Sequence, residues 1–252
     1  MPQILIDADI VTFQAAAGSE GTLSFGDDGE GFFMDPDLAL FKCNERVLDI
    51  QTKLESDDVL MCFSGRKNFR YDALPTYKHN RKDKHKPKLL GLLTDHLVSM
   101  YPSRIEPRLE ADDLLGVLTV EGETAIATID KDLDQIAGLH YNWKHDTIYK
   151  VDPRNALEYT WLQVLTGDST DGYKGIPRTG PKKAQKILDL HRDDDLTLEE
   201  QAVHYDEACW SAYASASLDW DYYASQVAVA QILQVGMWDQ KGSKVLTRHL
   251  TL

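Results

Sequence analysis

The sequence predicts an α/β fold with a mostly parallel sheet, followed by an all-helical C-terminal part. Three short apolar runs have the length and composition of buried strands: Gln3–Ile6, Val59–Phe63 and Thr124–Ile129. Segments with apolar residues at helical spacing alternate with them, and such alternation is typical of a parallel sheet. Functional residues of such sheets gather at the carboxyl ends of the strands, where Asp7 and Asp130 lie.

The remaining elements follow from periodicity and turn residues. Leu38, Phe41 and Val47 repeat at helical spacing, and Pro181 suits the first position of a helix. The predicted helices are Ile10–Ala17, Asp37–Leu54, Leu89–Met100, Ala111–Val120, Asn155–Leu165, Pro181–Leu190, Leu198–Tyr213 and Asp219–Val235. Further strands are expected at His140–Trp143 and Thr147–Val151, and a hairpin or mobile insertion at Gly18–Asp35.

Composition limits the class of protein. The 252 residues suffice for one large domain, or for a core domain with a smaller appendage. There is no apolar run of roughly 18 residues, so we expect no membrane-spanning helix. The start MPQILIDAD lacks the basic and apolar regions of a signal peptide, so we expect none. Cys43, Cys62 and Cys209 have no metal-binding spacing and are expected to be buried thiols in a reducing cytoplasm.

The distribution of charge points to a phosphate-rich partner. The net charge of −14 at first argues against nucleic acid. Between Arg66 and Lys88, however, nine residues are basic and two acidic, and between Lys174 and Arg192 six are basic and one is acidic. Two basic segments on an acidic chain are typical of local phosphate-binding surfaces. Solvated charged loops remain the alternative for either segment.

The most informative feature is a recurring set of carboxylates beside the predicted strands and helices. They are Asp7 and Asp9; Glu110, Asp112 and Asp113; Asp130, Asp132 and Asp134; Asp168; and Asp171. Carboxylates that converge in a fold repel one another unless a cation neutralises them, and oxygen-rich sites suit Mg²⁺ or Mn²⁺. The chemistry that fits such a site is two-metal hydrolysis of a phosphodiester.

Each group of acids also has a local explanation. Acids at the start of the helix Ala111–Val120 favour its dipole, but the dipole does not require three in four positions. Asp130 can cap a helix, but capping does not account for Asp132, which points the same way if the segment is extended or turning. Asp168 and Asp171 end a predicted helix, where acids oppose the dipole, so a bound metal explains them better.

Two segments have the composition of nucleic-acid contacts. Asp171 is followed by GYKGIPRTGPKKA, in which glycines allow tight turns and the next helix start offers amides to a phosphate. The segment NFRYDALPTYKHNRKDKHKPK mixes cations, which contact phosphates, with rings, which contact bases. In a helix, Lys78 and Arg81 would project together toward one phosphate.

Together these motifs resemble a known family. The order LIDAD, FRxxxLPxYKxNR, LEADDLLG, DKDLDQ and GDxxDGYKGIxxxG, within residues 3–190, is similar to the bacteriophage 5′→3′ exonuclease and flap endonuclease family, which includes the 5′-nuclease domains of bacterial DNA polymerases. The resemblance implies a Rossmann-like (PIN-like) nuclease domain over residues 1–160, with a basic helical arch at about 66–95. It also implies a helical DNA-binding module over 161–252, with a helix–hairpin–helix type motif at about 161–190 and C-terminal helices.

By position, the resemblance also implies roles for individual residues. The metal ligands, for two Mg²⁺ or Mn²⁺ ions, would be Asp7, Glu110, Asp112, Asp113, Asp130, Asp132, Asp168 and Asp171. Lys78 and Arg81 match catalytic residues of the arch that contact the scissile phosphate. The implied DNA contacts are Arg70, Tyr77, Lys82, Gly175, Arg178, Gly180, Lys182 and Lys183, with Tyr77 near the terminal nucleotide. Backbone carbonyls around Gly175–Gly180 would hold a K⁺ ion.

One position departs from the family pattern. The family places an aspartate just after the second strand, where this chain has Ser64 and Gly65. The first metal would then lose a ligand or an outer contact, for which Asp9 is a candidate replacement. The insertion 18–35 matches no family role.

The implied function is a metal-dependent 5′ nuclease that cuts at 5′ ends or flaps of duplex DNA in replication, primer removal or recombination. Its partner would be DNA with a 5′ end, nick or flap, in the cytoplasm of a bacterium or of a phage-infected cell; no membrane and no particular protein partner is implied. One alternative is a PIN-like ribonuclease, which the duplex-gripping turn disfavours. Another is a non-catalytic branched-DNA binding protein, which the carboxylate set disfavours because unneeded acids repel DNA.

Overall fold

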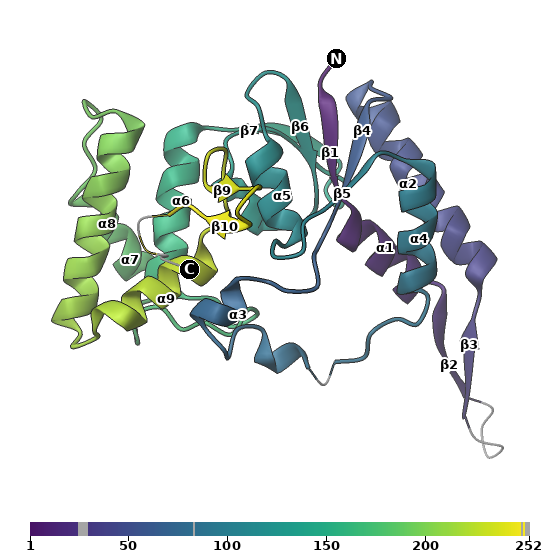
Figure 1. The fold of residues 1–252 in the computed structure, drawn as a ribbon, viewed down its shortest axis with the longest axis horizontal. Helices are drawn as coiled ribbons and strands as arrows, with labels where there is room; N and C mark the ends of the chain where they lie inside the picture. The colour runs from purple at the N-terminus through teal and green to yellow at the C-terminus, as the bar shows by residue number, and fades with distance from the viewer. Residues whose placement is uncertain (25–29, 83, 248, 250–252) are drawn as a thin grey trace. The chain divides into compact units, whose positions relative to one another are not determined.

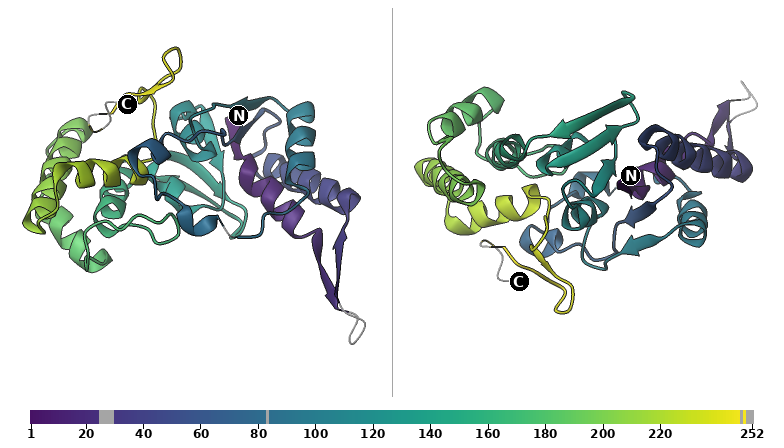
Figure 2. Two further views of the ribbon diagram at one scale, coloured as in Figure 1. Left: turned by 60° about the horizontal axis from the view of Figure 1, so that its bottom comes forward. Right: turned by 90° about the horizontal axis from the view of Figure 1, so that it is seen from above.

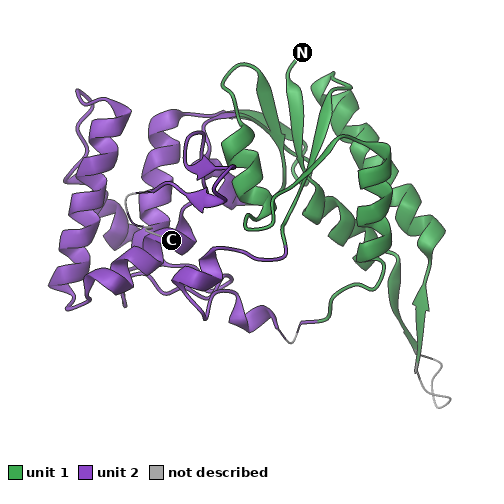
Figure 3. Cartoon of the chain, in the orientation of Figure 1, with its two compact units in different colours: residues 1–65, 85–130, 139–149 green, residues 66–84, 131–138, 150–252 purple. Residues whose placement is uncertain are grey.

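A computed structural model describes residues 1–24, 30–82, 84–247 and 249 of the chain. Its internal contacts define two compact units (Figure 3): unit 1 contains residues 1–65, 85–130 and 139–149, and unit 2 contains residues 66–84, 131–138 and 150–252. The units interleave in sequence because residues 66–84 and 131–138 group with the C-terminal part. Compactness alone does not define a domain, so the boundary predicted at residue 160 stays a prediction.

The sheet is mostly parallel, as predicted. Its six strands are β1 (Gln3–Asp7), β4 (Val59–Phe63), β5 (Ser103–Ile105), β6 (Thr124–Ala127), β7 (Gly138–Asn142) and β8 (Thr147–Val151), in the order β5-β4-β1-β6-β7-β8 (Figure 1). The pairs β1–β4, β1–β6, β4–β5 and β6–β7 are all parallel. The three-residue strand β5 was not predicted, because so short a run carries no periodicity.

Four helices of unit 1 follow the predicted segments closely. They are α1 (Ala8–Ala17), α2 (Pro36–Leu54), α4 (Leu90–Met100) and α5 (Ala111–Leu118). Ile4 and Ile6 of β1 belong to the core that also contains buried residues of α1, α2 and α4. Leu5, whose side chain points to the opposite face, is also 0% exposed. Both faces of β1 are therefore covered, as expected for a central parallel strand.

The segment 18–35 contains a hairpin, one of the two predicted possibilities. Its strands β2 (Glu20–Ser24) and β3 (Glu30–Met34) pair antiparallel and extend away from the sheet of unit 1 (Figures 1 and 2), while residues 25–29 lie outside the described part. Glu20 accepts hydrogen bonds from the backbone N–H of Lys88 at 2.9 and 3.0 Å. These contacts tie the hairpin to the last residue of the basic segment.

Unit 2 is largely helical, as predicted for the C-terminal part. Its helices are α3 (Arg70–Ala73), the 3₁₀ helices η2 (His79–Arg81) and η3 (Lys131–Gln135), α6 (Pro153–Thr166), α7 (Pro181–Asp189), α8 (Leu198–Ser215) and α9 (Trp220–Ala230). Helix α6 packs on α7, α8 and α9, and one buried cluster joins them. Two short strands, β9 (Trp238–Asp239) and β10 (Lys244–Val245), follow where the sequence predicted only helices, and α9 ends at Ala230 rather than Val235.

Two local predictions need correction. The basic segment contains only short helices before α4, and Lys78 itself has a left-handed φ of 51°, so Lys78 and Arg81 do not share a regular α-helix. Asp132 lies in the 3₁₀ helix η3, so the argument from an extended Asp130–Asp132 pair does not apply. Among the described residues, no helix combines the length and apolar character needed to cross a membrane. All three cysteines are free and buried, as predicted.

Candidate functional site

The first carboxylate of unit 1 is fixed at the carboxyl end of the central strand. Asp7 ends β1 and is 2% exposed. Its Oδ1 accepts the backbone N–H of Ile10 at 3.3 Å and so caps α1, and its Oδ2 accepts the hydroxyl of Thr128 at 2.9 Å. The strand-to-helix junction therefore places this buried carboxylate where the sequence predicted it.

Asp7 is in an environment that disfavours its charge. Burial and the charge of Asp9, with a smaller contribution from Asp130, raise the pKa of Asp7 to about 7, against the opposing effect of the Thr128 hydrogen bond. A divalent cation would relieve both the burial cost and the repulsion. The donor chemistry of these three carboxylates therefore fits a hard cation such as Mg²⁺ or Mn²⁺.

The position that departs from the family pattern has a clear structural explanation. A Cβ added to Gly65 would lie 2.0 Å from the backbone oxygen of Glu106, so this position has no room for a side chain. Ser64 donates its backbone N–H to Asp9 Oδ2 at 3.1 Å, and its hydroxyl oxygen accepts the N–H of Ala111 at 3.0 Å. Asp9 thus lies beside both Asp7 and the end of β4, where the missing acid was expected. It was not in the predicted ligand set.

Two of the three acids at the start of α5 form hydrogen bonds that cap the helix. Glu110 and Asp113 form a capping box, in which Asp113 accepts the Glu110 N–H at 3.1 Å. Asp113 is 0% exposed, whereas Asp112 and Glu110 are partly exposed. Glu110 and Asp113 therefore have a local role in a capping box, which the argument from the helix dipole did not include, and Asp112 is not part of the box.

In unit 2, Asp132 is held by two residues of α6. Gln163 donates from its amide to Asp132 Oδ1 at 2.7 Å, and the Tyr159 hydroxyl donates to the same oxygen at 3.3 Å. Sequence reasoning missed both partners. The signal was their i, i+4 spacing, which places a hydroxyl and an amide on one face of a helix.

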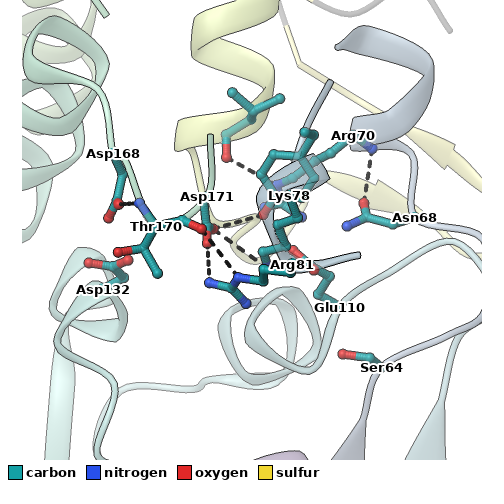
Figure 4. A network of polar contacts seen from close by, with 12 residues as sticks. Ser64, Asn68, Arg70, Lys78, Arg81, Glu110, Asp132, Asp168, Thr170 and Asp171 are labelled. Carbon is teal, nitrogen blue, oxygen red and sulfur yellow. Dashed lines mark hydrogen bonds and ion pairs between the residues drawn. The ribbon is translucent and has the colours of Figure 1, made fainter. Parts of the chain in front are cut away.

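Asp171 lies among the predicted catalytic cations (Figure 4). Its Oδ2 accepts the Tyr77 hydroxyl at 3.0 Å and lies 3.6 Å from Lys78 Nζ, while Arg81 donates to Oδ1. The nearby Asp168 accepts the backbone N–H of Thr170 within the same loop. The structure therefore brings Tyr77, Lys78 and Arg81 to Asp171, which lies about ninety residues later in the chain.

No closed metal site is present in the described residues. Among them, no three His, Cys, Asp or Glu side chains converge tightly enough to hold an ion in the arrangement seen. Ligation would require the carboxylates to move closer together. Repulsion among the carboxylates around Asp7 favours binding of a cation there, whereas Asp171 already has two cationic neighbours.

Three residues predicted to contact DNA are instead buried: Arg70, Tyr77 and Gly175. Arg70 is 2% exposed and donates to the carbonyls of Val229 at 3.2 Å and Gln231 at 2.8 Å, at the end of α9. Tyr77 is also 2% exposed, and its ring packs edge-on against Tyr71, which is 46% exposed. Arg70 therefore has a structural role, and the accessible ring in this segment is Tyr71, which the sequence did not distinguish from its neighbours.

The glycine turn between α6 and α7 is built by close backbone approach. Gly175 has a φ of +58°, and its Cβ would lie 2.4 Å from the nitrogen of Gly167. Gln226 of α9 accepts the N–H groups of Lys174 and Gly175 at 3.1 and 2.9 Å, which anchors the turn. The predicted contacts Lys82, Arg178, Gly180, Lys182 and Lys183 are exposed.

Two proteins of known name are similar to this chain in sequence. The flap endonuclease Xni of Shewanella baltica strain OS155 is 30% identical over 169 residues, which cover 59% of this chain and 64% of that protein. An exodeoxyribonuclease of Enterobacteria phage T3 is 27% identical over 192 residues, covering 70% of this chain and 63% of that protein. The chain thus spans less than two thirds of the length of either relative.

Solved structures agree on the fold. The T5 D15 protein, co-crystallised with metal ions, aligns over 91% of this chain and 93% of its own, with a TM-score of 0.56 and 14% identity. The catalytic core of Rad2 in complex with DNA substrate aligns over 92% of this chain and 73% of its own, with a TM-score of 0.51 and 15% identity. These likenesses confirm the predicted fold class.

The family described as 5′-3′ exonuclease, N-terminal resolvase-like domain, matches residues 2–160. This match covers the parallel sheet, the basic segment and all but two of the predicted metal ligands, Asp168 and Asp171. Because it extends over more than half of the chain, the protein belongs to the 5′-3′ exonuclease family.

Proposed function

We propose that this protein is a metal-dependent, structure-specific 5′ nuclease that hydrolyses phosphodiesters at the 5′ ends or flaps of duplex DNA. The observation that carries the proposal is the group of Asp7, Asp9 and Asp130 at the strand ends of a 5′-3′ exonuclease fold. Asp7 is buried and its neighbouring carboxylates help to raise its pKa, so its charge is costly unless a cation binds there. The names of the relatives, a flap endonuclease and an exodeoxyribonuclease, support this class of substrate.

The proposed ion sites use carboxylates of both units. Asp7, Asp130, Glu110, Asp112 and Asp113 would serve one Mg²⁺ or Mn²⁺, and Asp132, Asp168 and Asp171 a second. When bound, such ions activate water and neutralise charge on the phosphate. Metal ions in T5 D15 crystals are consistent with this cofactor class.

The other residues would bind and orient the DNA. Lys78 and Arg81 would stabilise the negative charge that develops on the scissile phosphate. The exposed cations Arg178, Lys182 and Lys183 would hold the backbone of the downstream duplex. A K⁺ ion at the carbonyls of the 175–180 turn would add to this grip, and DNA affinity should then be higher in K⁺ than in Na⁺ at equal ionic strength.

A cleavage assay tests the proposal. Labelled 5′-flap, nicked duplex and single-stranded DNA, with a matched RNA, are incubated with Mg²⁺, with Mn²⁺ and with EDTA. We expect metal-dependent release from the 5′ side of duplex or flap DNA, and product lengths separate exonuclease from flap endonuclease activity. Products should carry a 5′-phosphate, in the cytoplasmic setting of a bacterium or infected host.

The decisive variant changes Asp130→Asn together with Asp132→Asn. It should lower the metal-dependent rate by at least about 10²-fold, the scale of losing one strong electrostatic contribution to a transition state. An unchanged rate would contradict the metal mechanism. Cleavage of RNA alone would favour the ribonuclease, and binding of branched DNA without cleavage in Mn²⁺ would favour the binding protein.

A further inference from the structure

Lys78 and Asn80 of the basic segment are hydrogen-bonded to the loop that carries Asp171. Within unit 2, the Lys78 N–H donates to the Asp171 carbonyl at 2.8 Å. The Asn80 amide donates to the carbonyls of Ser169 at 2.8 Å and Thr170 at 3.2 Å. These bonds bring residues 77–81 and 168–171 side by side (Figure 4).

The side chain of Asp171 contacts three residues of the basic segment, Tyr77, Lys78 and Arg81. We call this set of four residues the clasp. Both carboxylate oxygens are engaged, Oδ2 by the Tyr77 hydroxyl and Lys78 and Oδ1 by Arg81. The side chains of Lys78 and Asp171 are only 15% and 18% exposed. Partial burial weakens screening by water, so these contacts are stronger than those of a surface ion pair.

The clasp competes with both proposed functions of its members. The two cations offset the negative charge of Asp171, which weakens its attraction for a divalent ion. The same pairing occupies Lys78 and Arg81, which are needed at a phosphate. A metal ion at Asp171 and a phosphate at the two cations would each break the same contacts.

We propose that the clasp is an exchange device that couples metal binding to DNA binding. Without metal, Asp171 holds Lys78 and Arg81; a divalent ion takes over Asp171 and releases the two cations to the DNA phosphate. By linkage, phosphate binding then strengthens metal binding by the same factor as metal binding strengthens phosphate binding. The proposal rests on the proposed function, and it assigns to Tyr77 a positioning role, since its hydroxyl holds Asp171 in the metal-free arrangement.

Metal titration without DNA tests the clasp with a readout other than activity. Mn²⁺ binding is measured by calorimetry, and the relevant binding event is the one that Asp171→Asn removes. Lys78→Ala should tighten that event by about 3- to 10-fold, because it deletes a competing cation, although it should slow cleavage. Arg81→Ala should act in the same direction, and it provides a second variant at a more exposed position.

Two further variants separate the clasp from general electrostatics. Tyr77→Phe keeps the net charge and removes only the hydroxyl, so it should also tighten Mn²⁺ binding, by less. Lys84→Ala removes an exposed cation of the same segment and should leave the affinity unchanged. A merely structural clasp predicts weaker or unchanged Mn²⁺ binding in Lys78→Ala and Tyr77→Phe, and that result overturns the proposal.

The outcomes also distinguish the clasp from the nuclease function. If Asp171→Asn removes no Mn²⁺ binding event while the unaltered protein cleaves DNA, the clasp proposal fails and the nuclease stands. If the unaltered protein cleaves neither DNA nor RNA with any metal, the proposed function fails first.

Discussion

The carboxylates of the two units are stabilised in opposite ways. In unit 1, burial and neighbouring acids raise the pKa of Asp7 to about 7. In unit 2, Asp171 lies between two cations, and Asp132 accepts hydrogen bonds from a neutral amide and a hydroxyl. The first arrangement is strained until a cation arrives, whereas the second is satisfied without one. Unit 1 should therefore provide metal affinity, and unit 2 should control when its own carboxylates become available.

The largest expected effect tests the strain in unit 1. Asp7→Asn should stabilise the metal-free protein at pH 8, by on the order of 3 kcal/mol, because it removes a buried charge while keeping an acceptor for Thr128. A raised carboxyl pKa costs the folded state most above about 7, and the cost fades as the pH falls toward the unfolded value of 3.8. The gain should therefore shrink by pH 5.

Urea unfolding in EDTA at pH 8 and pH 5 measures this difference. The exposed Asp57→Asn serves as the control, with no expected dependence on pH beyond that of the unaltered protein. A loss of stability in Asp7→Asn at pH 8 would contradict the difference between the units. It would show that the protein stabilises the charge of Asp7 as well as it stabilises the carboxylates of unit 2.

The second effect concerns Gly65, which lies where the family pattern places an aspartate. Gly65→Ala should destabilise the protein by about 2 to 3 kcal/mol, because the Cβ meets the Glu106 carbonyl. Gly91→Ala in α4 is the matched control: open space surrounds it, and alanine favours the helix by about 0.5 to 1 kcal/mol. Equal stability of the two variants in chemical denaturation would show that position 65 has room for a side chain after all.

The smallest expected effect concerns the uncharged donors that hydrogen-bond to Asp132. Gln163→Leu should weaken Mn²⁺ binding in unit 2 by about 10-fold or more, the usual scale for losing a partner that orients a metal ligand. Gln201→Leu is the control, because Gln201 is also buried but bonds to the backbone of His191 and Asp193, and should affect stability rather than affinity. Calorimetry that finds both variants equally impaired would refute a specific role for Gln163.

Hydrophobic periodicity and the residues at the ends of strands predicted the features that depend on local sequence. The strand β4 begins and ends as predicted, and Asp7 lies at the strand end where the pattern placed it. The start of α5 is also local, because the capping box of Glu110 and Asp113 needs only neighbouring residues, although the sequence argument for these acids considered only the helix dipole.

Long-range contacts decided the rest, and no local pattern reveals them. The burial of Arg70 depends on carbonyls about 160 residues away, and the clasp joins Arg81 to a residue ninety positions later. The steric limit at Gly65 comes from the backbone of Glu106 and Pro107. A basic or aromatic residue has the same sequence signature whether it binds DNA or holds the protein together.

The inward-facing Arg70 changes how salt should affect DNA binding. Each phosphate that a protein neutralises releases about 0.9 counterion from duplex DNA, so the salt dependence of affinity counts the cations that reach the backbone. Of the nine basic residues between Arg66 and Lys88, at least three are engaged within the protein: Arg70 with carbonyls, and Lys78 and Arg81 with Asp171. In metal-free solution the number of released ions should therefore be smaller than the charge of this segment suggests, and it should rise when a divalent ion frees two of the three.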